Sequence, residues 1–408
     1  MVASARVAYL ARRGSEYGVK ASALTIDMPT IRQRKRDIVN QFRTGNEKGL
    51  ASTANLEVIC GNARFTAEKT VEVALRDGGT RTVTGEQIFI NTGTRATTPK
   101  IDGLEDVAFL NNISIMELDK VPQHLIVVGG GYIELEFAQM FRRFGSEVSI
   151  VHRGRQVLDR EDEDIATAIQ SIFAEDGITV HLNAVTNRVN KVGENISLAF
   201  TAGNVAKTIS GSHLLIATGR KPNTDTLNCA AAKIELDERG FIRANEKLET
   251  SAAGVFVVGD VKGGPAFTHI SYDDFRILKG NLLDGREMSI ANRMVPYTVF
   301  IDPQLGRIGM TEHEARESGK KIKVATMPMS SVARALEMAE ARGVMKVVVD
   351  ADSGQILGAG ILGIEGGEIA SMLQIAMMGK LSYTALRDGT FSHPTLSEAL
   401  NNVFKKLE

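Results

Sequence analysis

The stretch LIVVGGGYIELEFA, residues 125–138, decides the fold of this chain. Its first four apolar residues predict a buried strand, its glycines predict a tight turn, and the following apolar spacing predicts a helix over about Tyr132 to Phe144. In Gly129-Gly130-Gly131, the first glycine permits the turn and the last lets the backbone approach a pyrophosphate, which the helix amino terminus binds through free N–H groups. A purely structural turn is the alternative, but the flanking strand and helix favour dinucleotide binding.

One position in this stretch departs from the dinucleotide-binding pattern. The third glycine of that pattern falls at position 134, where this sequence has Glu134. Glycine packs the helix against the strand there, and a carboxylate close to a pyrophosphate repels it. We therefore expect Glu134 to weaken nucleotide binding. The side chains that we expect to face the core from this helix are Ile133, Phe137, Met140, Phe141 and Phe144.

The end of the next predicted strand, Val148 to Val151, distinguishes NAD from NADP. An acid that binds the ribose is typical of NAD sites and falls about 20 residues beyond the glycines. Here the loop reads His152-Arg153-Gly154-Arg155. Two guanidinium groups without an acid favour a 2′-phosphate, and therefore NADPH. A basic surface loop is the alternative.

Two apolar strands end on Thr-Gly, at Thr92-Gly93 and at Thr218-Gly219, and a third, Val255 to Val258, ends on Gly259-Asp260. The repeated ending predicts two dinucleotide-binding folds, one nested in the other, in an α/β chain. An aspartate at the end of a buried strand can accept hydrogen bonds from a ligand hydroxyl. A helix cap is the alternative for Asp260, and the repeated endings favour a second nucleotide.

From Arg293 onward the pattern is that of an α+β domain, with a hairpin followed by a helix over 367–380 whose methionines pack either a subunit interface or the core.

The last motif is FSHPTLSE, residues 391–398. In it, Glu398 would fix the tautomer of the His393 imidazole and make it a general acid–base. A helix cap formed by Thr395 or Ser397 is the alternative.

Composition excludes several classes of function. The chain has 408 residues, too many for a single core, and its 48 basic and 49 acidic residues give no bulk attraction to nucleic acid or to an anionic membrane. It contains no apolar stretch of about 18 residues and no apolar leader, which predicts a cytoplasmic protein without a membrane span. Cys60 and Cys229 have neither redox nor metal-site spacing, so we expect two buried, reduced thiols and no metal.

Taken together, the chain resembles the flavin-dependent pyridine nucleotide–disulfide oxidoreductases, the group of glutathione reductase, dihydrolipoamide dehydrogenase and mercuric reductase. The resemblance covers essentially the whole chain in the family's order, and is nearest to the mercuric-reductase-like branch that includes the reactive-chlorine-resistance flavoenzymes. The segments that carry it are IFINTGT (88–94), IVVGGGYIELEFA (126–138), LLIATGRKPNT (214–224), VFVVGDVKGGPAFTHIS (255–271), PYTVFIDPQLGRIGMTE (296–312) and HPTLSEAL (393–400).

The resemblance implies a role for individual residues. Tyr132 would lie over the flavin where nicotinamide docks, Glu136 would pair with a lysine beside the flavin, and Asp260 would bind the ribityl chain. His393 and Glu398 would form an acid–base pair donated across a homodimer to the other subunit. The residues expected to bind FAD or NADPH are Gly129, Gly130, Gly131, Tyr132, Ile133, Glu136, His152, Arg153, Arg155, Gly219, Thr92, Gly93, Gly259, Asp260, Phe267 and Thr268.

The resemblance also implies the domains. We expect residues 1–107 and 227–292 to form the two parts of an FAD domain, 108–226 the NAD(P) domain, and 293–408 the dimerisation domain. Family members carry, before the helix that starts here at about Met1, a βαβ unit for the FAD pyrophosphate and a CxxxxC disulfide. Neither is present in these 408 residues. We therefore expect an amino-terminally shortened chain whose FAD domain is incomplete, and, without a carboxyl-terminal cysteine pair, no mercury reduction.

Three hypotheses for function follow. The leading one is an NADPH-dependent FAD oxidoreductase, which passes a hydride from NADPH to flavin and on to an unidentified small-molecule acceptor, and is impaired by the missing segment. The second is a non-catalytic NADPH-binding dimer or a truncated gene product. The third is a flavin diaphorase or transhydrogenase that needs no disulfide.

Overall fold

The strand predicted before the glycine turn is the centre of a four-stranded parallel sheet. In this computed structural model, which describes residues 1–20 and 24–408, the order of the sheet is β12-β6-β7-β8. Its strands are β6 (His124–Val128), β7 (Glu147–Val151), β8 (Ile178–His181) and β12 (His213–Ile216). The order reverses between β6 and β12, which is the switch point where doubly wound sheets bind nucleotides.

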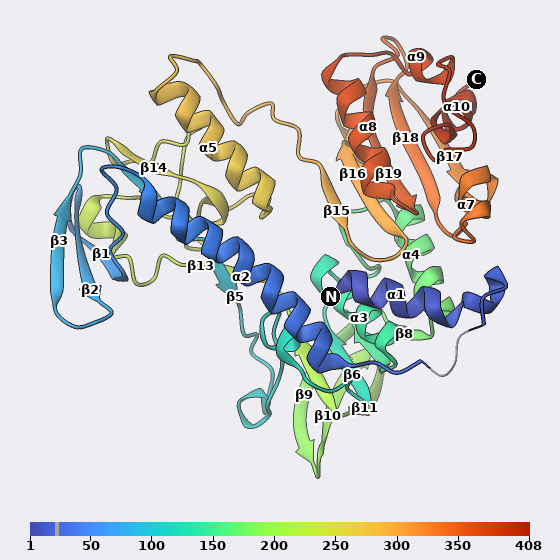
Figure 1. Cartoon of the computed structure of the whole chain (residues 1–408), viewed down its shortest axis with the longest axis horizontal. Coiled ribbons are helices and arrows are strands. Elements are labelled where there is room, and N and C mark those ends of the chain that lie inside the picture. Colours follow the sequence, from blue (N-terminus) through green and yellow to red (C-terminus); the bar gives the residue numbers. More distant parts are fainter. Residues whose placement is uncertain (21–23) are drawn as a thin grey trace. The chain divides into compact units, whose positions relative to one another are not determined.

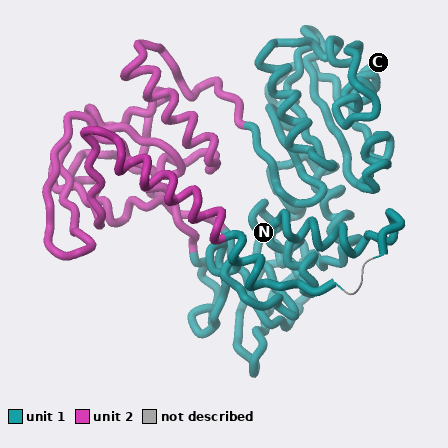
Figure 2. The backbone as a smooth tube through the Cα atoms, in the orientation of Figure 1, with its two compact units in different colours: residues 1–35, 98–218, 296–408 teal, residues 36–97, 219–295 magenta. Residues whose placement is uncertain are grey.

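The chain divides into two compact units, coloured separately in Figure 2. Unit 1 comprises Met1–Lys35, Thr98–Thr218 and Pro296–Glu408, and unit 2 comprises Arg36–Thr97 and Gly219–Val295. Unit 2 is thus built from two segments that flank the parallel sheet in the sequence. This is the nested α/β arrangement predicted from the repeated Thr-Gly endings.

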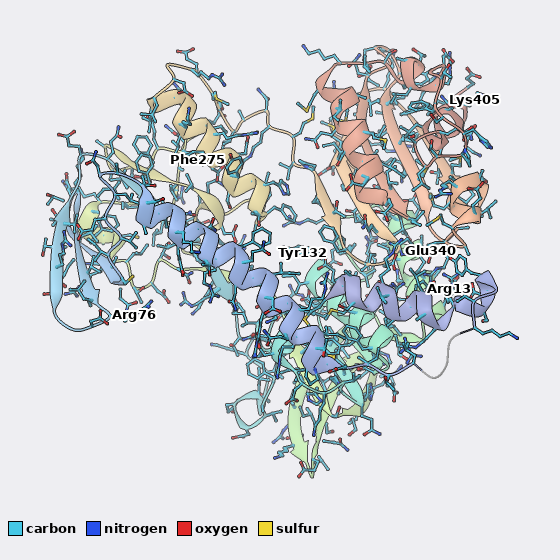
Figure 3. All side chains as sticks on the ribbon, viewed as in Figure 1. Arg13, Arg76, Tyr132, Phe275, Glu340 and Lys405 are labelled. Carbon is cyan, nitrogen blue, oxygen red and sulfur yellow. The ribbon has the colours of Figure 1, made fainter. Side chains whose placement is uncertain are left out.

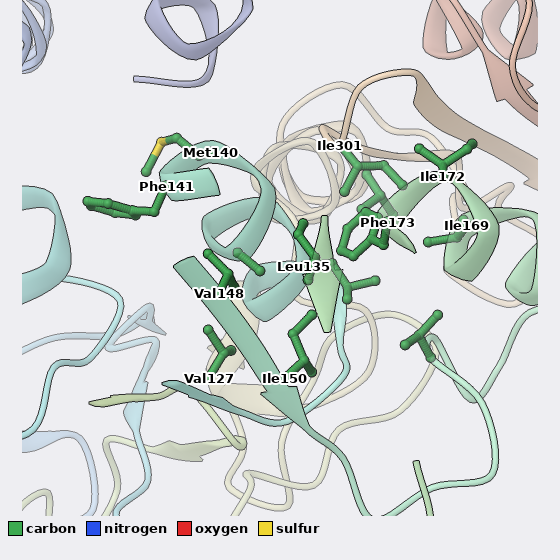
Figure 4. Packing of buried hydrophobic residues seen from close by; sticks show 14 of the residues in the cluster. Val127, Leu135, Met140, Phe141, Val148, Ile150, Ile169, Ile172, Phe173 and Ile301 are labelled. Atoms are coloured by element: carbon green, nitrogen blue, oxygen red, sulfur yellow. The ribbon is translucent and has the colours of Figure 1, made fainter. Parts of the chain in front are cut away.

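Helices α3 (Tyr132–Phe144) and α4 (Glu163–Glu175) pack against the parallel sheet in unit 1. Figure 4 shows their side chains interleaved with those of the strands, among them Leu135 and Phe173, which are both fully buried. Met140, Phe141 and Phe144 are buried as predicted. Phe137 is partly buried and packs against the same core, as predicted. The prediction for Ile133 is wrong: it is only half-buried, because Leu135 and Ala138 face the sheet instead.

An antiparallel meander and the amino-terminal helix complete this part of unit 1. The chain passes from β8 to β12 through an antiparallel meander of β9 (Ala184–Val192), β10 (Asn195–Ala202) and β11 (Val205–Gly211). At the amino terminus, α1 (Val2–Arg12) packs against α3: the Arg143 guanidinium lies 3.8 Å from the ring centroid of Tyr9, whose hydroxyl donates to Glu340 at 3.0 Å. Burial raises the pKa of Tyr9 to about 12, and Figure 3 shows Glu340 near Arg13 at the end of α1.

The carboxyl-terminal part of unit 1 is a five-stranded antiparallel sheet in the order β15-β16-β19-β18-β17, visible in Figure 1. Helix α8 (Gly366–Met378) packs on β16 and β19 through Ile369 and Leu373, whereas Met372 and Met378 are exposed. These two methionines therefore do not pack the core of this chain. The other elements are β15 (Tyr297–Val299), β16 (Gln304–Gly309), α6 (Glu312–Glu317), β17 (Ile322–Pro328), α7 (Ala333–Glu337), β18 (Val344–Asp350), β19 (Ile356–Gly363), α9 (Tyr383–Arg387) and α10 (Ala399–Lys405).

Unit 2 contains a two-stranded parallel sheet, in which β4 pairs with β14 and Ile88 lies opposite Val255. Helix α5 packs on this sheet, where Ile277 and Leu278 contact Phe256 and Val258. The elements are β1 (Gly61–Ala67), β2 (Thr70–Leu75), β3 (Thr80–Thr84), β4 (Ile88–Ile90), β5 (Thr94–Ala96), β13 (Arg220–Pro222), β14 (Val255–Val257) and α5 (Thr268–Leu282). Helix α2 (Met28–Ser52) contributes residues to both units.

One expectation about unit 2 is wrong. Cys60 is exposed, at the end of a segment, residues 56–60, that forms no strand and also exposes Leu56 and Val58. Cys229 is a buried free thiol, as expected. Among the helices of the described ranges, none is both long and apolar enough to cross a lipid bilayer.

Candidate dinucleotide sites

The glycine turn follows directly on the central strand β6. Gly129 has φ +118°, a backbone conformation that favours glycine. A Cβ atom at Gly130 would lie 2.6 Å from Cγ of His152, so a side chain there would collide with the imidazole. Gly131 caps the amino terminus of α3. The predicted strand, turn and helix are therefore all present, and the amino terminus of α3 follows the turn.

The Glu134 carboxylate lies over this turn. Glu134 is the third residue of α3, and its side chain reaches back so that Oε1 would be 2.5 Å from a Cβ at Gly129, and Oε2 3.0 Å from one at Gly131. Burial raises the pKa of Glu134 to about 7, although the nearby backbone N–H groups of Gly131 and Glu134 oppose the rise.

The loop after β7 folds back onto the same turn, since the N–H of Leu158 donates to the carbonyl of Gly130 at 2.9 Å. The His152 ring is buried, and its Nδ1 has no hydrogen-bond partner in the described part of the chain. Arg153 and Arg155 are exposed. Sequence reasoning missed Asp159, whose Oδ1 lies 3.3 Å from Nε2 of His152. An acid seven residues after the histidine was the available signal.

Two further predicted residues lie on α3. Tyr132, labelled in Figure 3, is the first residue of the helix and is 36% exposed. The Glu136 carboxylate accepts the backbone N–H of Phe300 at 2.8 Å, and burial raises its pKa. In the described residues of unit 1, this carboxylate is thus held by backbone rather than by a lysine.

The second group of predicted residues lies in unit 2, at one edge of the two-stranded sheet. Because β4 and β14 are parallel, Thr92-Gly93 and Gly259-Asp260 follow the same end of the sheet. Gly93 and Gly219 have positive φ, and a Cβ at either would meet no atom within 4 Å, so both positions are open. The Asp260 carboxylate accepts a hydrogen bond from the Thr94 hydroxyl at 3.2 Å. Phe267 and Thr268 open helix α5 beyond this edge.

A buried carboxylate, which sequence reasoning missed, supports the Gly259-Asp260 turn. Asp274 on α5 is fully buried, and its Oδ2 accepts the backbone N–H of Gly259 at 2.8 Å. Its charge is balanced by Arg293, whose Nη1 donates to Oδ1 at 2.5 Å, and by Lys262, whose Nζ lies 3.1 Å from Oδ2. The only sequence signal was an acid on the helix that follows the turn.

The predicted His–Glu pair is formed in the carboxyl-terminal part of unit 1. His393 Nδ1 lies 2.8 Å from Oε2 and 3.1 Å from Oε1 of Glu398, and the imidazole is largely exposed. This geometry leaves Nε2 free to exchange a proton with solvent or a substrate. The alternative, a helix cap by Thr395 or Ser397, is not formed: the N-cap of α10 is Glu398, without a side-chain cap bond, and Thr395 Oγ1 accepts the N–H of Glu398 at 3.3 Å in the turn before the helix.

Comparison with known proteins places both groups of strand ends in one family match. Residues 6–274 match the sequence pattern of the pyridine nucleotide-disulphide oxidoreductases, and residues 295–404 match the dimerisation domain of the same family. The chain belongs to the pyridine nucleotide-disulphide oxidoreductases. It is therefore an oxidoreductase of mixed α/β fold with a dimerisation domain, as the resemblance implied.

Individual relatives of this oxidoreductase agree with that assignment. The probable pyridine nucleotide-disulfide oxidoreductase RclA of Escherichia coli strain K12 is 39% identical over 374 residues, which cover 91% of this chain and 84% of RclA. Mercuric reductase of Streptomyces lividans is 33% identical over 401 residues, or 98% of this chain and 84% of that protein. A solved structure of the Cu(II) complex of the HOCl-induced flavoprotein disulfide reductase RclA from Escherichia coli has a TM-score of 0.87 at 38% identity, covering 92% of this chain and 85% of that one.

Proposed function

We propose that this chain is an NADPH-dependent flavoprotein oxidoreductase that works as a homodimer and transfers a hydride from NADPH to FAD and on to a small-molecule acceptor. The observation that carries the proposal is the glycine turn of β6 and α3, with a basic loop folded onto it. We further propose the domain boundaries given above: 1–107 and 227–292 for FAD, 108–226 for NADPH and 293–408 for dimerisation.

The residues of unit 1 fit a nicotinamide nucleotide with a 2′-phosphate. The helix amino terminus at Gly131 supplies N–H groups for a pyrophosphate. The buried Nδ1 of His152 lacks a partner within the described residues, and the guanidinium groups of Arg153 and Arg155 are exposed on the same loop. Guanidinium groups bind phosphate through paired, charge-assisted hydrogen bonds, which supports NADPH over NADH.

The residues of unit 2 fit the flavin side of the proposal in part. The open positions Gly93 and Gly219 let a ligand approach the backbone, and Asp260 presents a carboxylate that can accept hydrogen bonds from a polyol. When bound, FAD supplies the two-electron centre that takes up the hydride. The relative RclA is described as a flavoprotein disulfide reductase. We do not propose a disulfide relay through Cys60 and Cys229, because their spacing is not that of a CxxxxC motif.

The absorbance of the purified protein tests this function. We expect the oxidised-flavin band in the visible spectrum, and we expect NADPH to bleach it in the absence of oxygen. Bleaching that continues to a dye or quinone without any thiol step would favour the diaphorase or transhydrogenase alternative. A colourless protein that still binds NADPH contradicts the proposed activity and supports the non-catalytic dimer.

We expect His393→Ala to slow the transfer of reducing equivalents to the acceptor by about 10²–10⁴-fold, the range typical of a lost general acid–base. The reason is that Glu398 orients the imidazole through Nδ1 and leaves Nε2 to move the proton. Flavin bleaching by NADPH, followed by stopped flow, should change less than about twofold, because hydride transfer from NADPH needs no proton from this group. Steady-state turnover with the acceptor measures the larger effect.

His313→Ala is the matched control for this prediction. His313 is also exposed and lies 3.3 Å from a glutamate, Glu317, but it belongs to helix α6 and to no predicted site. Its replacement should leave both rates unchanged. Equal effects of the two substitutions, or no effect of His393→Ala on turnover, would remove His393 from the proposed proton transfer.

A further inference from the structure

Glu134 holds the place in the glycine turn that a phosphate needs. In a helix amino terminus that binds a dinucleotide, the first N–H groups and the backbone of the second glycine contact the pyrophosphate oxygens. Here the Glu134 carboxyl group lies over that backbone: Oε1 is 2.5 Å from where a Cβ of Gly129 would be, and Oε2 is 3.0 Å from where a Cβ of Gly131 would be. An anionic side chain of this chain therefore occupies the place that the anion of a ligand would take.

The contact has an ordinary structural cause. A glutamate at the third position of a helix commonly bends back to the N–H of the capping residue, and Glu134 is the third residue of α3 after the cap Gly131. In α6 the third residue, Glu314, accepts the N–H of the cap Thr311 at 2.8 Å and completes a capping box. In α3 the third residue, Glu134, instead lies over a glycine turn.

The Glu134 carboxyl group is buried. The residue is only 5% exposed, and its position on α3 is the one where a glycine normally brings helix and strand together. Among the described residues no cationic side chain forms an ion pair with it: the His152 ring packs on Gly130 with Nε2 turned toward Asp159, and the turn itself consists of glycines. An ionised carboxylate beside a pyrophosphate in such a buried place would be repelled strongly, whereas a neutral carboxyl group can donate a hydrogen bond to it.

We propose that Glu134 is a proton-controlled gate of the nicotinamide nucleotide site, so that the pyrophosphate enters the glycine turn only together with a proton taken up by this carboxyl group. The inference rests on the proposed function of the same turn and adds its regulation. Nucleotide affinity then falls as pH rises, and a neutral side chain at position 134 removes that dependence.

The sign and size of the effect follow from the ionisation of the free site. Below the pKa of about 7 the carboxyl group is already neutral and binding costs nothing extra. Above it, each pH unit lowers the neutral fraction about tenfold, and affinity falls with it. At pH 8 wild-type protein should therefore bind NADP⁺ about tenfold more weakly than Glu134→Gln, and at pH 6 the two should be nearly equal.

Isothermal titration of the full chain with NADP⁺ tests the gate, because this oxidised nucleotide binds without transferring a hydride. At pH 8, in two buffers of different ionisation enthalpy, wild-type protein should take up nearly one proton more per NADP⁺ than Glu134→Gln. The comparison between variants cancels the protons that belong to the nucleotide and to groups other than Glu134. Glu134→Gly, which removes the side chain, should bind NADP⁺ as tightly as Glu134→Gln. It shows whether the tighter binding comes from losing the carboxyl group or from a new contact made by the glutamine amide.

Glu314→Gln is the matched control, since Glu314 is likewise the third residue of its helix but lies away from the turn, and its replacement should leave affinity and proton uptake unchanged. Equal affinity, pH dependence and proton uptake in wild type and Glu134→Gln would overturn the gate, as would tighter binding in the variants without a difference in proton uptake. If neither wild type nor the two Glu134 variants binds NADP⁺ even at pH 6, the proposed function fails, and the gate fails with it.

Discussion

Replacing Asp274 with asparagine is expected to destabilise unit 2 by about 3–5 kcal/mol, the usual cost of leaving buried charges without their partner. The carboxylate is fully buried and balances two cations, Lys262 and Arg293, while it also holds the N–H of Gly259. An amide has the same shape but no charge, so Lys262 would remain buried without this partner, and Arg293 would keep only the more distant carboxylate of Asp273, at 3.6 Å. The turn that carries Asp260 would lose its support at the same time.

Hydrogen exchange followed by mass spectrometry measures this effect locally, since it reports on the amides of β14 and α5 separately from unit 1. Asp284→Asn is the control, because Asp284 forms an exposed ion pair with Lys279 of α5 and its loss should cost no more than about 1 kcal/mol. Similar protection losses for the two substitutions would mean that the buried charges do not depend on Asp274.

Replacing Arg153 and Arg155 together with alanine is expected to weaken NADPH binding by about 100-fold or more and NADH binding by less than about threefold. Each hydrogen bond to a charged group contributes roughly 1.5–3 kcal/mol, and only NADPH carries the 2′-phosphate that would receive them. Both side chains are exposed on the loop that folds over Gly130, so their loss should leave the core unchanged. Dissociation constants of the two nucleotides, measured by fluorescence titration, give the ratio.

A substitution at Asp159 tests the same assignment of the loop to a 2′-phosphate in the opposite direction. Its carboxylate lies beside His152 and would repel a 2′-phosphate but accept a ribose hydroxyl. Asp159→Asn should therefore strengthen NADPH binding relative to NADH. An equal loss of both nucleotides in the double arginine variant, or a loss of NADPH in Asp159→Asn, would contradict the assignment of this loop to a 2′-phosphate.

What could be predicted from the sequence was local. Helix α3 begins and ends at the predicted residues, because glycines flank a continuous run of helix-compatible residues. The His393–Glu398 contact was also predictable, since five residues separate the pair and a helix starts at the second. In each case neighbours in sequence decide the geometry.

What could not be predicted depends on contacts between distant segments. The rotation of α3 that buries Leu135 instead of Ile133 is set by its packing on the sheet, and the role of Asp274 requires Gly259 and Arg293 to come together around it. The conflict at Glu134 was visible in the sequence, but the direction of its side chain was not. In the structure the Glu134 side chain bends back, and its carboxyl group lies over the backbone of Gly129 and Gly131.

The division of unit 2 into two segments has a consequence for how the protein is made. Strand β4 leaves the ribosome early, but its partner β14, which pairs Val255 with Ile88, follows only after the whole parallel sheet of unit 1 has been synthesised. Pairing between segments so far apart in the sequence forms slowly, because the entropy of closing a long loop is lost before the contacts form. We therefore expect the parallel sheet around the glycine turn to fold during translation, before unit 2 is complete. Until then β4 has no partner strand, and its unpaired edge can bind chaperones or aggregate.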